Sequence, residues 1–88
     1  MTIEKTNDSL GYVVVYSLLT KKEATATSYG ISVTKKSFGG QTEVVEKENI
    51  TPSYIEAFLL LHLLCACDVT PVGLDDTLEY LYDYAASV

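Results

Sequence analysis

Arginine is absent from this 88-residue chain, and its basic side chains are all lysines. The formal net charge is −6 at pH 7. Arginine is the residue best suited to bidentate contacts with phosphates and base edges, and neutralisation of phosphates supplies most of the affinity for nucleic acids. An acidic chain without arginine therefore argues against binding to nucleic acids, and equally against binding to anionic membrane surfaces.

The chain also lacks an apolar run long enough to cross a membrane, which needs about 20 predominantly apolar residues. The longest run, from Ala57 to Cys67, is about half that length, contains His62, and lies between Glu56 and Asp68. The polar N-terminal residues show no apolar segment of a signal peptide. We expect a cytoplasmic protein without a membrane partner, and an exposed apolar helix in contact with a membrane is the alternative.

Cysteine is scarce, and the motifs of common catalytic sites are missing. Cys65 and Cys67 are too close in sequence for an easy structural disulfide. The sequence contains no P-loop, no dinucleotide-binding glycine motif and no nucleophile elbow. We therefore expect a protein that is not an enzyme and that holds no cofactor or metal.

The segment from Ile50 to Cys67 reads as a central helix. Thr51 is suited to the N-cap position and Pro52 to the first helical position, and Ile50 and Ile55 have the spacing of a hydrophobic staple. A helix that is apolar on nearly all sides is expected to be buried on nearly all sides. We predict that Leu60, Leu61 and Leu64 are buried and that Phe58 packs against the sheet residues Val13, Val15, Ile31 and Val33.

Three segments before this helix have the composition of β-strands, and residues 1–9 read as a flexible arm. Residues 12–19 are β-branched or aromatic on both faces, which favours a central strand or one with a covered outer face. Residues 25–36 alternate between apolar and small polar side chains, with Gly30 marking a bulge or a close approach. A Phe38-Gly39-Gly40 turn leads to a charged edge strand over residues 41–49.

A second helix is predicted to follow the N-cap Thr70 and Pro71, with an apolar stripe that begins at Leu74 and an acidic stripe on another side. The acidic stripe, typical of a solvated helix face, contains Asp76, Glu79 and Asp83. The sequence therefore predicts an α+β domain over residues 10–88. Its predicted layout is a three-stranded antiparallel meander followed by two helices (βββαα) in two layers.

The chain resembles a family of short uncharacterised proteins from anaerobic Gram-positive bacteria. The resemblance rests on the strand with Tyr29-Gly30-Ile31, the leucine-rich helix, the Val69-Thr70-Pro71-x-x-Leu74-Asp75 helix start and the closing Asp83-Tyr84. It implies the same βββαα layout and a bacterial cytoplasmic setting, and it implies no activity.

Tyrosine is the residue type that most suggests a surface for a partner, because it is enriched where a surface is partly buried by another protein. Tyr12 and Tyr16 share a strand face, and Tyr80 and Tyr84 share a helix flank. We interpret the protein as a small non-enzymatic interaction module that binds another protein or itself as a homodimer. Tyrosines at the edge of the core, with hydroxyls at the water line, are the competing interpretation.

A small-ligand, metal-binding or redox protein is the alternative function. Its candidate groups are His62, Cys65 and Cys67, spaced as H-x-x-C-x-C. Zinc usually needs four ligands in two separated pairs, and the chain has no second cluster of Cys or His. Cysteines that behave as small core hydrophobes are the simpler interpretation.

Overall fold

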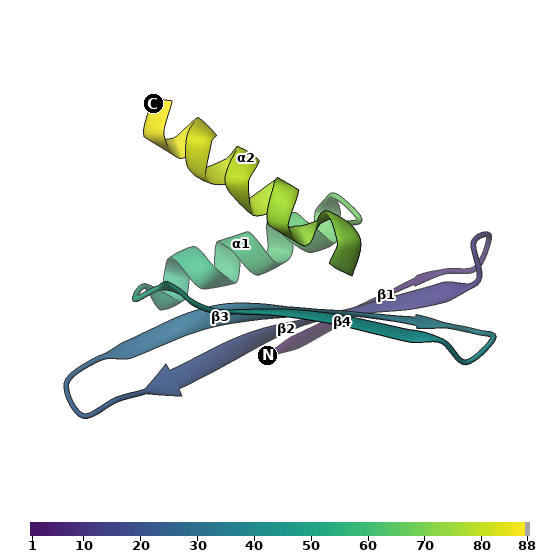
Figure 1. Ribbon diagram of the computed structural model, residues 1–88, viewed down its shortest axis with the longest axis horizontal. Coiled ribbons are helices and arrows are strands. Elements are labelled where there is room, and N and C mark those ends of the chain that lie inside the picture. Colours follow the sequence, from purple (N-terminus) through teal and green to yellow (C-terminus); the bar gives the residue numbers. More distant parts are fainter. Residues whose placement is uncertain (88) are drawn as a thin grey trace.

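A four-stranded antiparallel sheet, rather than the predicted three-stranded one, forms the base of the molecule. The computed structural model describes the backbone of residues 1–87 and the side chains of residues 1–80. The strands lie side by side in chain order, and both helices lie on one side of the sheet (Figure 1). The fold is therefore α+β as expected, but the βββαα layout is wrong by one strand. The strands are β1 (Thr2–Asn7), β2 (Tyr12–Lys22), β3 (Thr27–Ser37) and β4 (Thr42–Thr51).

The additional strand, β1, lies within the segment that we expected to be a flexible arm. It pairs with β2 from Thr2↔Ser17 to Asn7↔Tyr12, so β2 has a neighbour on each side. The Lys5 ammonium group reaches over the sheet to the end of the first helix, where it lies 2.7 Å from the Asp68 carboxylate. It also donates a hydrogen bond of 3.0 Å to the carbonyl of Cys65. β1 is thus held by its ladder with β2 and by a lysine that interacts with a helix C-terminus.

The β3–β4 ladder contains the irregularity that Gly30 indicated. The register shifts between Tyr29 and Ile31, where β4 carries extra residues and Asn49 adopts a positive φ of 55°. A Cβ atom on Gly30 would collide with the carbonyl oxygen of Lys47 and would lie 2.8 Å from the Cα atom of Glu48. Glycine is therefore required here because the backbone of β4 closes over it.

Helix α1 (Tyr54–Ala66) begins two residues later than the sequence predicted. The N-cap is Ser53, whose hydroxyl accepts a hydrogen bond of 3.3 Å from the backbone N–H of Glu56. Thr51, the expected N-cap, ends β4 and donates its hydroxyl to the Glu56 carboxylate at 2.6 Å. Ser53 and Glu56 have the Ser-x-x-Glu spacing of a capping box. The Glu56 carboxylate accepts its hydrogen bond from the Thr51 hydroxyl, in place of the N-cap backbone N–H that it accepts from in a complete capping box.

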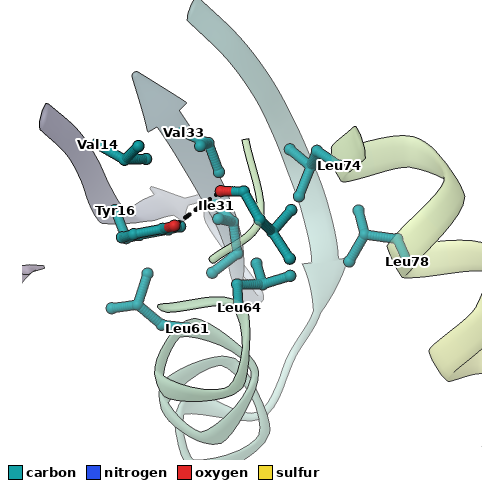
Figure 2. Close-up of a cluster of buried hydrophobic side chains, with 9 residues drawn as sticks. Val14, Tyr16, Ile31, Val33, Leu61, Leu64, Leu74 and Leu78 are labelled. Carbon is teal, nitrogen blue, oxygen red and sulfur yellow. Dashed lines mark hydrogen bonds between the residues drawn. The ribbon is translucent and has the colours of Figure 1, made fainter. Parts of the chain in front are cut away.

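The core lies between one face of the sheet and the inner side of α1. Tyr16 is completely buried, and its hydroxyl donates a hydrogen bond of 2.7 Å to the carbonyl of Val69 (Figure 2). This contact ties the middle of β2 to the loop that follows α1, and burial of the ring raises the pKa of Tyr16 far above its ordinary value. The buried hydrophobic side chains are Val14, Tyr16, Ile31, Val33, Ala57, Leu61, Leu64, Val69, Leu74 and Leu78.

The predicted packing of α1 is partly wrong. Leu61 and Leu64 are fully buried as expected, whereas Leu60 is only half-buried. Val13 and Val15 point to the opposite face of the sheet from the buried Val14 and Tyr16, because successive side chains of a strand alternate between the faces. Phe58 is not in the core and lies instead on the side of α1 between Tyr54 and His62.

The predicted start of the second helix at Thr70 and Pro71 is the start of a 3₁₀ turn over Pro71–Gly73, which continues directly into helix α2 (Leu74–Ser87). Leu74 and Leu78 enter the core, and Lys47 of β4 lies 2.7 Å from the Asp75 carboxylate of α2. Beyond this anchored first part, α2 rises away from the sheet and diverges from α1 (Figure 1). On the outer side of α1, Ile55, Leu59 and Leu63 are exposed.

Candidate functional site

The outer face of α1 is an apolar surface that the fold leaves exposed. We define it as two ridges that run along the helix at a spacing of four residues, since side chains four apart lie one above another. The aliphatic ridge is Ile55, Leu59 and Leu63, whose side chains are 69%, 60% and 43% exposed. The aromatic ridge is Tyr54, Phe58 and His62.

The aromatic ridge is a continuous row of neighbouring rings. Phe58 lies between Tyr54, with ring centroids 6.2 Å apart, and His62, with ring centroids 4.4 Å apart. Tyr29 of β3 extends the row with an edge-to-face contact of 5.6 Å to Tyr54. Contacts of this kind each contribute roughly 0.5–1.5 kcal/mol beyond the area that they bury. The ridge is therefore pre-ordered in the free chain, which lowers the entropic cost of covering it.

The outer face is almost free of charge. Glu56 is the one acidic residue within α1, and the helix contains no lysine. Its carboxylate is already bonded to the Thr51 hydroxyl, and Asp68, just past the helix, is paired with Lys5. A surface with this composition has no charged group to offer a nucleotide, a phosphate or a basic peptide. It fits an uncharged apolar surface.

Of the four tyrosines predicted to form an interaction surface, the structure describes the side chains of Tyr12, Tyr16 and Tyr80. Tyr16 is in the core and is not accessible on the chain, so its assignment to a surface is wrong. Tyr12 is half-buried beside it, with the Lys35 ammonium group 4.6 Å from the centre of its ring. Tyr80 is 68% exposed on α2. Tyr84 lies on α2 beyond the residues whose side chains the structure describes.

The alternative ligand set is also dispersed. His62 is exposed and stacks on Phe58, Cys65 is half-buried, and Cys67 is exposed at the C-cap of α1. In the described part of the chain, no three His, Cys, Asp or Glu side chains are grouped as metal ligands. The three residues of this alternative set therefore lie on the last turns of α1 and at its C-cap.

The described residues also form depressions on the surface. One beside the β-bulge, with a volume of about 270 Å³, is open to solvent and has Gly30, Glu46 and Glu48 among its lining residues. Within the described residues, every buried side-chain nitrogen or oxygen has a hydrogen-bond partner, so no unpaired buried polar atom marks a ligand site there. The helices of the described chain also include none with the length and apolar character of a membrane span.

Comparison with models of protein families gives a match over most of the chain. The model of a family of unknown function, DUF6514, matches residues 1–83. The chain belongs to the DUF6514 family. No curated protein and no solved structure matches it. The expected membership of an uncharacterised family is therefore confirmed, and the match includes the β1 segment.

The outer face of α1 in this DUF6514 protein could have been found from its sequence. The helix was recognised as apolar on nearly all sides, and the inference that all sides are buried was the error. A layer of two helices on one sheet can cover α1 on both sides only if the second helix lies along the first. The second helix carries an apolar stripe beside an acidic one, and the first two leucines of that stripe, Leu74 and Leu78, pack into the core rather than on the outer side of α1.

Proposed function

We propose that this DUF6514 protein is a small non-enzymatic interaction module that uses the outer face of α1 to bind an uncharged apolar helix of a protein partner. The observation that carries the proposal is the exposure of Ile55, Leu59 and Leu63 on a helix with almost no charge. Contiguous exposed apolar patches of a few hundred Å² on a soluble domain commonly mark interaction sites. A helix is the natural occupant because ridges at a spacing of four residues pack into the grooves of another helix.

Two further features support this use of α1. The sheet below the helix and the hydrogen bonds at both helix ends hold α1 in place, so the surface is rigid before binding. The aromatic ridge offers Tyr54 and Phe58, residue types that are enriched at the centres of interfaces.

The cellular setting of the protein is a further part of the proposal. We infer that the protein works in the cytoplasm of an anaerobic Gram-positive bacterium, without a cofactor and without nucleic acid. The net charge of −6 and the absence of arginine support the last point. A mobility-shift assay with DNA and RNA at low salt tests it, and a salt-dependent shift would overturn it.

Photo-crosslinking in the cells that produce the protein tests the site. Leu59 is replaced by benzoylphenylalanine, and a matched variant carries the same group in place of Val44, which is also exposed but lies on the sheet. We expect an adduct from position 59 that is lost in a Leu63→Lys background, and mass spectrometry should map the attached peptide to an apolar helical segment. No adduct at position 59, or attachment to a charged loop, contradicts the proposal.

A further inference from the structure

We propose that the occupant of the outer face of α1 is the same face of a second copy of this chain. The two α1 helices would pair antiparallel, with Leu59 of each copy at the twofold axis. This inference rests on the proposed function, because it names the partner of the same surface.

The spacing of the aliphatic ridge suits a twofold axis. Ile55 and Leu63 lie four residues on either side of Leu59, so a rotation about Leu59 places Ile55 of one copy against Leu63 of the other. Each aliphatic side chain then meets an aliphatic side chain, as a self-complementary isologous contact requires. Both ridges follow the i, i+4 rows, which interdigitate at a crossing angle of about −50° in the commonest class of helix packing.

The distribution of charge favours this partner over an oppositely charged one. The chain carries a net charge of −6, yet α1 contributes only Glu56 to the acidic groups. Asp75, Asp76 and Glu79 lie on α2, and Glu43, Glu46 and Glu48 lie on β4. Self-pairing through α1 therefore avoids the like-charge repulsion that pairing through α2 or the β4 edge would create. A basic partner would find its complement on those elements and not on the outer face.

The area available on α1 predicts a dimer of modest affinity. The side chains of the two ridges, of which Phe58 is the least exposed, together offer on the order of 500 Å² per copy, given that a fully buried aromatic residue hides about 150–250 Å². Two copies then bury about 1,000 Å², which is near the lower limit for a specific interface and typical of a weak or transient one. We expect a dissociation constant in the micromolar range.

Sedimentation of the full chain under reducing conditions tests self-association. The wild type should shift from monomer to dimer over micromolar concentrations, and Leu59→Lys should weaken the association at least about tenfold by placing two ammonium groups at the axis. Val44→Lys, on the sheet, should associate like the wild type. A monomeric wild type, or equal loss in both variants, would overturn the inference.

Disulfide crosslinking tests the geometry in a Cys65→Ser, Cys67→Ser background whose fold is first verified by circular dichroism. Leu59→Cys should form a disulfide-linked dimer, because facing Cα atoms of helices 8–10 Å apart lie within about 7 Å. Ile55→Cys should not, because the antiparallel arrangement separates the two copies of this position by about 12 Å along the axis. Crosslinking of Ile55→Cys alone, or of neither variant, contradicts the antiparallel pair.

The two proposals fail in different ways. If the wild type stays monomeric while benzoylphenylalanine at position 59 attaches to an apolar helix of another protein, self-pairing is wrong and the proposed function stands. If position 59 gives no adduct and the chain stays monomeric, both are wrong. An adduct of twice the mass of the chain supports both.

Discussion

The two sides of α1 have nearly the same composition and opposite environments. Ala57, Leu61 and Leu64 on the inner side are buried against the sheet, whereas Ile55, Leu59 and Leu63 on the outer face are largely exposed. Their side chains are equally apolar, so the hydrophobic effect alone does not distinguish the sides. What distinguishes them is the number of elements that the chain can supply: one sheet covers one side of a helix, and α2 diverges instead of covering the other.

The apolar composition of a helix in a short chain therefore predicts how much surface must be covered, but not which element or partner covers it. The inner side is covered within the chain and should control stability. The outer face is covered within the chain only at its margins and should control association. Substitutions on the two sides of the same helix can therefore separate folding from binding.

Leu61→Ala, on the inner side of α1, should cause the largest loss of stability. Leu61 is completely buried, and truncating a buried leucine typically costs about 2–5 kcal/mol. Small domains have a total stability of about 5–15 kcal/mol, so this change should bring the protein close to unfolding. Urea denaturation of the variant beside the wild type measures the difference. If Leu61→Ala is as stable as the wild type, the inner side of α1 is not the core.

Gly30→Ala tests the packing within the sheet, where the backbone of β4 closes over β3. Any Cβ atom at this position meets the backbone of Lys47 and Glu48, and backbone cannot move aside as a flexible side chain can. We expect a loss of about 1–3 kcal/mol, the usual cost of overpacking a well-packed site. Gly39→Ala is the matched control, because a Cβ atom there has no neighbour within 4 Å. Equal denaturation midpoints for the two variants would show that the closure of β4 over β3 is not tight.

Tyr16→Phe tests the polar contact between the inner sheet face and the loop after α1. Loss of the hydrogen bond to the Val69 carbonyl should cost about 1–2 kcal/mol at neutral pH. Burial raises the pKa of Tyr16, so above pH ~10 the unfolded chain releases this proton while the folded chain retains it. The free energy of unfolding of the wild type should therefore fall with rising pH by up to about 1.4 kcal/mol per unit.

The alkaline loss should be shallower in Tyr16→Phe than in the wild type, as measured by urea denaturation between neutral and alkaline pH. Tyr80→Phe is the matched control, because it removes a tyrosine hydroxyl from a side chain that is exposed on α2. A wild-type slope retained in Tyr16→Phe would assign the alkaline loss to other groups.

The elements that the sequence predicted correctly are those whose signals are local. The turn at Phe38–Gly40, the alternation around Ile31 and Val33 and the Thr70-Pro71 helix start all depend on residues within a few positions of one another. The bulge at Gly30 belongs with them, since a mid-strand glycine indicated it.

β1 was missed because it is stabilised by tertiary contacts: one apolar residue, Ile3, pairing with β2, and a lysine that reaches Asp68. An indirect signal existed, since β2 is apolar on both faces and favoured a central position. A central strand needs a neighbour on each side, and only residues 1–9 remained to provide it. Tyr16 was misassigned because a strand pattern places its ring on a face without showing that a helix covers that face.

Leu59→Lys, on the outer face, should have the smallest effect on folding. It therefore tests most directly whether the two sides of α1 differ in role. Leu59 is largely exposed in the monomer, and its replacement should change the free energy of unfolding by no more than about 0.5 kcal/mol, the usual scale for surface substitutions. Asp76→Ala, an exposed change on α2, should fall in the same range. Denaturation must be measured well below micromolar protein, because dimer formation adds concentration-dependent stability to the wild type.

Raising the protein concentration then separates the two exposed variants. The wild type and Asp76→Ala should gain stability as dimers form, whereas Leu59→Lys should not, because its apolar contact at the axis is replaced by two like charges. A loss of several kcal/mol in Leu59→Lys at low concentration would mean that the outer face is part of the folding core after all. The two sides of α1 would then no longer differ in role, and the assignment of folding to one and association to the other would be wrong.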